Sequence, residues 1–192
     1  MSTAETTFPV TYDVEYPDRL SRLLIFVKWL LAIPHFIVLY VLGLVTGLFT
    51  VIAWFAILFT GRYPRGMFDF VVGVNRWSYN ASAYILLLRD EYPPFSMERG
   101  RYPLTYEVEY PERLSRLLIF VKWLLVLPNV IVLAFLWLAV YVTSIIAWFA
   151  ILFTGQYPRG LFDFAAGVMR WGARVNAYSN LLRDDYPPFS LK

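Results

Sequence analysis

The strongest constraint on the fold is that the chain contains one stretch of sequence twice. An offset of 94 residues aligns 8–96 with 102–190 without a gap, and 58 of the 89 aligned residues are identical. A repeat of this length indicates two equivalent folding units in tandem. We therefore expect a first membrane repeat unit at 8–96, a linker at 97–101 and a second membrane repeat unit at 102–190.

Long apolar runs in each unit indicate a membrane protein. Of all residues, 59% are hydrophobic and only 16% are charged, whereas soluble domains carry about 25% charged residues. The runs predict a first helix at 18–33 and 112–127, which ends before a proline. A second helix, at 35–59 and 129–153, has about 25 residues and is long enough to cross a hydrocarbon core of about 30 Å.

Two further segments complete each unit. The alternating sequences "VTYDVEYP" and "LTYEVEYP" predict short extended arms at the start of the units. After the second helix, 68–88 and 162–182 predict an amphipathic helix at the membrane interface, because its polar residues fall on one stripe. That stripe consists of Asp69, Gly73, Arg76 and Asn80 in the first unit and of Asp163, Gly167, Arg170 and Arg174 in the second.

The membrane topology depends on whether the first helix crosses. If only the second helix of each unit crossed, Lys and Arg would divide 8 to 9 between the two sides, without a positive-inside bias. A hairpin that turns at 34–35 and 128–129 gathers nearly all charges on one side, although its first helix is short for a crossing. We favour the hairpin. The predicted fold is an all-α integral membrane protein, a tandem repeat of a helix hairpin plus an interfacial amphipathic helix, with short extended arms.

Composition removes several classes of site. The chain has no cysteine, a single histidine (His35) and a net charge of only +3. Disulfides and thiolate metal sites are excluded, and one histidine cannot build a zinc site alone. Lys and Arg form no cluster that would follow a nucleic acid. We expect no catalytic residue, cofactor, metal or nucleic-acid partner, and the protein is predicted not to be an enzyme.

Two lysines and two repeated motifs are the candidate functional residues. Lys28 and Lys122 lie inside apolar runs, where a charge must reach the interface or find a partner, and such a charge is a functional hypothesis by default. The motifs "LFTGRYPRGMFDF" and "LFTGQYPRGLFDF" combine glycine, arginine and aspartate, but they lack the Lys-Ser/Thr that ends a phosphate loop. We interpret them as collars of a membrane helix. An arginine in each can pair with an aspartate one turn later, Arg65 with Asp69 and Arg159 with Asp163.

The second helices also predict how the units associate. Association in lipid requires small or polar residues that let backbones approach. Small residues gather at 43–50 in the first unit, where the second unit carries larger ones at 137–144. This pattern predicts that the units interlock about a pseudo-twofold axis, with Gly47 at the contact.

The repeated motifs resemble one known family. "VEYPxRLSRLLxxVKWLLxxP", "WFAILFTGxYPRGxFDF", "RW", "NAY" and "YPPFS" look like the prokaryotic membrane family called domain of unknown function 4389, over both units. The motif "NAY" is present at 176–178, whereas the first copy reads "ASAY" at 81–84. The resemblance implies a bacterial or archaeal membrane protein and supplies no activity. We expect a multi-pass protein of the cytoplasmic (inner) membrane, with both termini on the cytoplasmic side.

Three functions are compatible with these features. We favour a non-enzymatic integral membrane scaffold or accessory subunit that contacts lipids and assembles as a homo-oligomer or within a larger membrane complex. An oligomeric channel or transporter is the alternative, with Lys28, Lys122 and the polar stripe lining the path. A membrane enzyme acting on a lipid or quinone is the least favoured, because the aspartates of the collars have no nucleophile or metal beside them.

Overall fold

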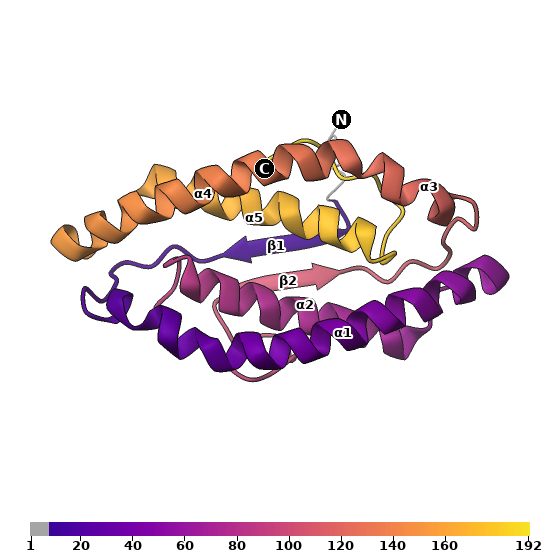
Figure 1. The fold of residues 1–192 in the computed structure, drawn as a ribbon, viewed down its shortest axis with the longest axis horizontal. Coiled ribbons are helices and arrows are strands. Elements are labelled where there is room, and N and C mark those ends of the chain that lie inside the picture. The colour runs from indigo at the N-terminus through magenta and orange to yellow at the C-terminus, as the bar shows by residue number, and fades with distance from the viewer. Residues whose placement is uncertain (1–7) are drawn as a thin grey trace, which may run out of the picture.

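The computed structural model describes residues 8–192, and most of these residues are helical (Figure 1). Two helices are much longer than the others, and two short strands pair across the middle of the molecule. The elements in chain order are β1 (Val10–Val14), the 3-10 turn η1 (Leu24–Phe26), α1 (Lys28–Thr60), α2 (Arg65–Ile85), β2 (Leu104–Val108), α3 (Leu118–Leu125), α4 (Leu127–Thr154) and α5 (Arg159–Ser179).

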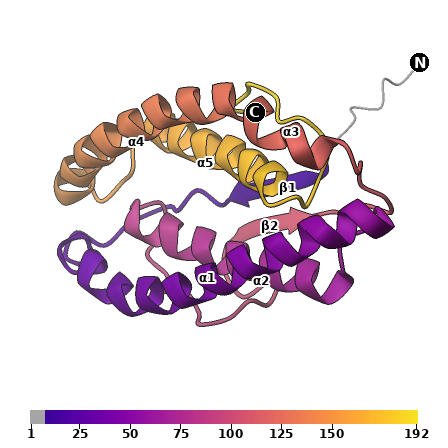
Figure 2. The same ribbon diagram turned by 45° about the vertical axis from the view of Figure 1, so that its right-hand side comes forward.

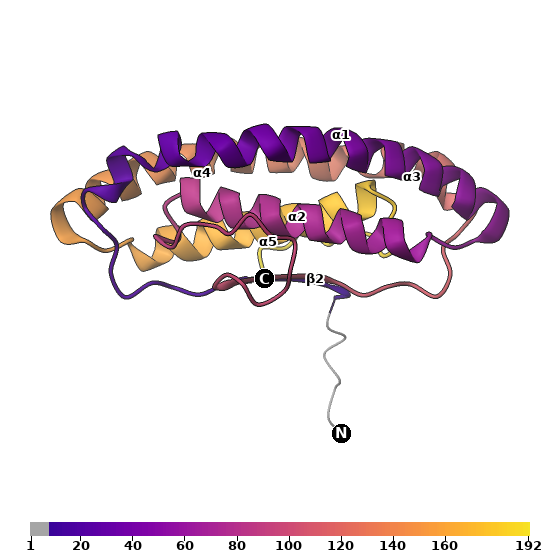
Figure 3. The ribbon, with the colours of Figure 1, turned by 90° about the horizontal axis from the view of Figure 1, so that it is seen from below.

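The elements form three layers, which Figure 3 shows from the side. Helices α1 and α4 form one outer layer, α2 and α5 the middle layer, and the strands the opposite face. β1 pairs antiparallel with β2, and Tyr12 lies opposite Tyr106, its equivalent in the second unit. A pseudo-twofold axis therefore passes through the sheet and relates the two α-helical pairs seen in Figure 2.

The predicted hairpin is wrong. Helix α1 continues from Lys28 to Thr60 with Pro34 inside it, and the chain does not reverse there. In the second unit only Val126 separates α3 from α4, and the Val130 N–H donates to the Val126 carbonyl, so the segment 118–154 also runs on in one direction. A proline removes one hydrogen bond, but the apolar sequence on both sides favours helix and packs on the same neighbour, so the helix continues.

The beginning of the first helix also differs from the prediction. The residues at 18–23 are not helical, and α1 begins only at Lys28. Backbone groups here bond to the other unit instead. The Leu20 N–H donates to the Gly155 carbonyl over 2.9 Å, and in the second unit the equivalent Leu114 N–H donates to the Gly61 carbonyl over 2.8 Å. These long-range bonds hold the segments before α1 and α3 extended.

The ends of the long helices follow the prediction. Gly61 and Gly155 end α1 and α4 with φ of 71° and 74°, a left-handed conformation that glycine adopts readily. Pro64 and Pro158 then precede the next helices, which begin at Arg65 and Arg159, three residues earlier than expected. The turn sends α2 back along α1 and α5 back along α4.

The third helix of each unit lies between two other layers and is not exposed along one whole face, which differs from the predicted amphipathic helix. α2 packs on α1 with one face and on β2 with the other, and more than half of its residues are buried. Beyond Asp69, which is exposed, the predicted polar stripe of α2 faces the inside: Gly73 is so close to Met97 that an added Cβ would lie 2.9 Å from it. The amphipathic pattern is therefore that of a middle layer packed between the long helix and the sheet.

The two units exchange their N-terminal arms. β1 of the first unit packs on α5 of the second, and β2 of the second packs on α2 of the first. The hydroxyl of Tyr16 donates to the Tyr157 carbonyl, and the hydroxyl of Tyr110 donates to the Tyr63 carbonyl. Each helical pair is therefore completed by the arm of the other unit.

Candidate lipid-facing surface and its polar anchors

The outer layer carries almost all of the exposed apolar surface. The large apolar side chains that are exposed lie within 23–59 and 117–153, apart from Tyr92, Phe95, Tyr186 and Phe189. Only a narrow stripe of α1 is buried, and its members recur at intervals of three, four and seven residues, which is one helix face. This stripe consists of Lys28, Ala32, His35, Leu39, Thr46, Ala53 and Ile57. The other faces of α1 are apolar and uncovered.

Two apolar grooves open on this layer, related by the pseudo-twofold axis. One, of about 500 Å³, lies between α1 and α3 beside Trp54 and Trp123. The other, of about 710 Å³, lies between the start of α1 and the end of α4 beside Trp29 and Trp148. Long helices that do not pack tightly on each other leave such grooves, which are large enough for hydrocarbon chains.

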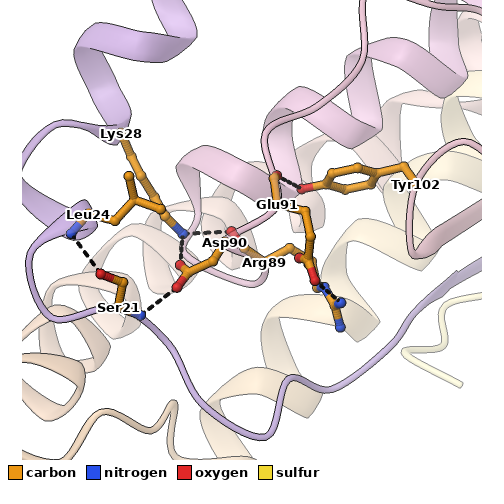
Figure 4. A network of polar contacts seen from close by, with 7 residues as sticks. All are labelled: Ser21, Leu24, Lys28, Arg89, Asp90, Glu91 and Tyr102. Atoms are coloured by element: carbon orange, nitrogen blue, oxygen red, sulfur yellow. Dashed lines mark hydrogen bonds and ion pairs between the residues drawn. The ribbon is translucent and has the colours of Figure 1, made fainter.

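Lys28 is buried at the base of one groove and is anchored from below (Figure 4). Its Nζ lies 2.7 Å from Oδ1 of Asp90 and donates to the Arg89 carbonyl over 2.6 Å. The backbone N–H of Ser21 donates to the other oxygen of Asp90. The ammonium also lies 4.9 Å from the centre of the Tyr84 ring, within the range of a cation–π contact. A buried lysine held in this way needs no path to the interface.

Lys122 repeats the arrangement in the second unit. Its Nζ lies 2.8 Å from Oδ1 of Asp184 and donates to the Arg183 carbonyl over 2.6 Å. Of the two expectations for the lysines, the structure therefore shows a partner rather than reach to the interface. Sequence reasoning missed both aspartates, although the repeated "RDEYPPFS" and "RDDYPPFS" carried the signal.

Next to Lys28, Arg89 fixes the segment that supplies Asp90. Its guanidinium contacts the Glu91 carboxylate through Nε over 2.9 Å, and its other side donates to the Glu15 carbonyl of the arm over 2.9 Å. Burial alone would raise the pKa of the Glu91 carboxyl, but the hydrogen bonds and charge of Arg89 outweigh burial and lower that pKa below its ordinary value. Tyr102 donates to the Glu91 carbonyl over 2.9 Å and closes the network.

Arg76 and Arg170, from the predicted polar stripe, connect the middle layer to the sheet. Arg76 donates to the Tyr106 carbonyl over 3.1 Å and pairs with Glu107 at the same distance. Arg170 makes the equivalent contacts with the Tyr12 carbonyl and with Asp13 of the first unit. Each arginine therefore binds the strand that packs on its own helix, and in both cases the other unit supplies that strand.

The collar pairs predicted from sequence are confirmed. Arg65 lies 3.3 Å from Asp69, and Arg159 lies 3.2 Å from Asp163, one helical turn apart and exposed. Arg65 also stacks on the ring of Tyr110, with its guanidinium carbon 4.5 Å from the ring centre. Exposed pairs of this kind contribute at most about 1 kcal/mol, and the collars lie at the start of α2 and α5.

Position 35 holds the buried side chain next to Pro34. His35 accepts a hydrogen bond at Nδ1 from Nε1 of Trp77 over 3.0 Å and stacks on Phe95 with ring centres 4.0 Å apart. In the second unit Asn129 takes the same place, accepts from Trp171 over 2.8 Å and donates to the Tyr186 hydroxyl over 2.8 Å. Both side chains serve as an acceptor for a buried indole, and sequence reasoning missed this role.

Gly47 does not form the predicted contact between the units. An added Cβ on Gly47 or Gly43 would meet nothing within 4 Å. The units contact each other through the sheet, the exchanged arms and a hydrogen bond from Asn75 of α2 to Asn176 of α5. In the outer layer, Phe26 of η1 packs on Trp148 of α4, and Phe120 of α3 packs on Trp54 of α1. The predicted interlocking of the long helices within one chain is therefore wrong, while a role of Gly47 between separate chains stays a prediction.

The buried polar groups of these sites are used for structure. Every lysine and arginine described above is held by a carboxylate or a backbone carbonyl. Within residues 8–192 no group of three or more His, Asp or Glu side chains is placed to hold a metal ion. The arrangement is suited to holding a large apolar surface rigidly on a polar base.

Comparison with known proteins identifies the repeated unit. The family model described as domain of unknown function (DUF4389) matches twice, over residues 22–97 and 116–190. Comparison with curated proteins and with solved structures gives no match. The two matched segments coincide with the two helical pairs and omit the exchanged arms before residue 22 and at 98–115. Because the matches cover most of the chain, the protein belongs to the DUF4389 family and carries two tandem copies of that domain.

Proposed function

We propose that the protein is a non-enzymatic membrane scaffold or accessory subunit that lies flat in one leaflet, with α1 and α4 in the lipid. The observation that carries this proposal is the separation of surfaces. One outer layer is apolar along its full length, and the opposite layer carries the sheet with exposed Thr11, Asp13 and Thr105. An exposed apolar layer that runs along two long helices on one face is typical of a membrane contact.

A crossing orientation is less favourable, although α1 and the segment 118–154 are long and apolar enough to cross a membrane. The sheet and α2 run beside the middle of α1. If α1 crossed the bilayer, Arg76, Glu107 and the unpaired outer edges of a two-stranded sheet would lie near its centre. Open sheet edges are not tolerated in hydrocarbon, and each central charge costs about 3 kcal/mol.

The flat orientation also explains the curvature of the long helices. In Figure 3, α1 and α4 arch away from the sheet, so that their ends turn back toward the polar layers. Charged residues gather at these ends, as in the segment 18–22 and around Arg62. The middle of the arch then reaches deepest into the leaflet, and its ends reach the headgroups. The sheet side remains available for assembly with a second copy or with a larger complex.

Cysteine labelling distinguishes the two orientations. The chain has no cysteine of its own, so Thr60→Cys at the end of α1 and Thr154→Cys at the end of α4 each report one exposed position, at opposite ends of the molecule. In sealed vesicles, the flat orientation predicts that both react with an impermeant maleimide from the same side. Labelling from opposite sides would establish a crossing and reject the flat orientation.

Assembly is tested separately on the intact protein. Chemical crosslinking in native membranes, followed by purification in mild detergent and mass spectrometry, should recover either a complex of several copies or a partner in fixed stoichiometry. A protein recovered only as a monomer would contradict a scaffold or accessory role, whatever its orientation.

A further inference from the structure

Three arginines meet at one end of the molecule. Arg62 follows the end of α1, and Arg113 and Arg116 lie in the segment between β2 and α3, which passes that end in Figure 1. Together with Thr60, Gly61 and Leu114 they line a hollow of about 440 Å³. The hollow is held in place by the backbone bond from the Leu114 N–H to the Gly61 carbonyl.

No carboxylate in residues 8–192 forms an ion pair with these three arginines. The other arginine clusters differ, because Arg65, Arg76 and Arg89 each have an acidic partner within 3.3 Å. The end of a helix favours a cation, and Arg116 is held there with its Nε 3.5 Å from the position of a Cβ on Gly61. The contact with the helix end stabilises one guanidinium group. Three guanidinium groups around one hollow repel one another, and an anion between them would offset that repulsion.

The surroundings of the hollow are those of a lipid interface. Leu117 follows Arg116 directly and is 80% exposed, and Phe59, just before the end of α1, is 73% exposed. These are among the most exposed apolar side chains described, and both belong to the apolar outer layer. A guanidinium cluster beside such side chains matches the boundary between acyl chains and phosphate groups.

We infer that this hollow binds the phosphate group of an anionic lipid, with its acyl chains on the adjacent apolar layer. Arginine donates in a fork that fits phosphate oxygens, and three guanidinium groups supply more donors than one phosphate needs. The inference rests on the proposed flat orientation, which places the hollow at headgroup depth. The inference adds to that orientation a ligand, an anionic phospholipid, and the end of the molecule that binds it.

The opposite end of the molecule supplies a matched comparison. There Gly155 ends α4 beside Arg22, whose Nε lies 3.5 Å from the position of a Cβ on that glycine. Arg19 and Arg22 correspond to Arg113 and Arg116, but Gln156 replaces Arg62. The second end therefore has two arginines instead of three, and we expect its affinity for a phosphate group to be at least about tenfold lower.

The test is a titration of the full-length protein in micelles of a nonionic detergent, read by native mass spectrometry. The probes are dioctanoyl phosphatidylglycerol, dioctanoyl phosphatidylcholine and inorganic phosphate. The wild type should bind one phosphatidylglycerol tightly, and phosphatidylcholine about tenfold or more weakly. Arg62→Gln should lose the tight site, and Gln156→Arg should raise the number of tight sites from one to two. Arg99→Gln, which removes an exposed arginine already paired with Glu107, should leave binding unchanged.

Each outcome decides the inference. Equal binding of both lipids, unchanged binding by Arg62→Gln, or a single site in Gln156→Arg would overturn it. Displacement of the lipid by equimolar inorganic phosphate would also overturn it, because the site would then recognise a free anion. If Arg62→Gln fails to fold, the gain of a site in Gln156→Arg still decides. If Thr60→Cys and Thr154→Cys label from the same side while the wild type binds no phosphatidylglycerol tightly, only the lipid site is rejected and the flat orientation stands. The two proposals therefore fail separately.

Discussion

The two copies of the unit are identical where the arm enters the long helix and differ most along the middle of that helix. The segments 21–30 and 115–124 are identical, whereas 41–50 and 135–144 share only two of ten residues. The identical segments leave the exchanged arm, supply the N–H that binds Asp90 or Asp184, and enter the long helix at the buried lysine. The divergent segments lie on the middle of α1 and α4, where nearly every side chain is exposed or half-buried. Both pairs of segments are mostly exposed, so the difference follows the contacts: the identical segments bind the aspartates, while the middle of the long helices keeps only its apolar character.

The largest effect should come from separating the copies. Residues 1–96 and 97–192 expressed alone should not be stable as monomers in membranes, because a helical pair lacks the arm that completes it unless a second copy supplies that arm. A protease site inserted at 97–101 should leave the two halves associated after cleavage. Size-exclusion chromatography in mild detergent measures both results. A half that is folded and stable alone would show that the exchanged arms are not required.

The buried lysine pairs should come next. Asp90→Ala leaves the Lys28 ammonium buried without its carboxylate, which should cost about 3–5 kcal/mol, and Asp184→Ala should cost the same in the second unit. Asp69→Ala, which breaks only the exposed collar pair, is the control and should cost less than about 1 kcal/mol. Thermal unfolding in detergent measures all three. Unequal effects of the first two would show that the copies are not energetically equivalent.

The indole acceptors give a smaller effect and a direct exchange between copies. His35→Leu removes the acceptor of Trp77 and should cost about 1–3 kcal/mol. His35→Asn installs the residue that the second unit uses at position 129 and should cost less than half as much. The melting temperature of both variants checks this order. If the asparagine variant is as unstable as the leucine variant, the two sites do not share one geometry.

The smallest effect concerns the Arg89–Glu91 pair and its pH dependence. The pKa of Glu91 is lowered in the folded state, so its contribution is present above the ordinary carboxyl pKa and is lost as the pH falls through the folded value. Wild type should be slightly more stable than Glu91→Gln at pH 7, and the difference should shrink below about pH 4. Glu98→Gln, in the exposed linker, is the control. A difference that stays constant from pH 7 to pH 3 would exclude a charged role for Glu91.

Local features of the fold could be predicted from the sequence, and long-range ones could not. The glycine ends of the long helices and the Arg65–Asp69 pair depend on residues a few positions apart, and both are found. The sequence predicts a turn at Pro34, but Pro34 lies inside α1, because whether a proline ends a helix depends on what the flanking residues pack on. The partner of Lys28 is 62 residues away, so only the repetition of the motif around Asp90 could have suggested it.

The exchange of arms could not be predicted at all from a repeat. Two equivalent arms fit two equivalent helical pairs in either pairing, and the sequence of the unit is the same in both arrangements. The candidate site had the same difficulty, because Arg62 and Arg116 belong to different units and meet only when the arms are exchanged. In the sequence, Arg62 lies beside a helix end and Arg116 lies after an arm. Nothing in the sequence near either arginine indicates the other.

Joining the two units in one chain changes what symmetry permits. A homodimer of one unit would carry the same residue at both ends of its long axis, so any ligand site would occur twice. In the fused chain a five-residue linker keeps the partner arm at a high local concentration, on the order of millimolar, and the two ends can differ. Arg62 at one end and Gln156 at the other give an otherwise symmetric molecule a direction along its length.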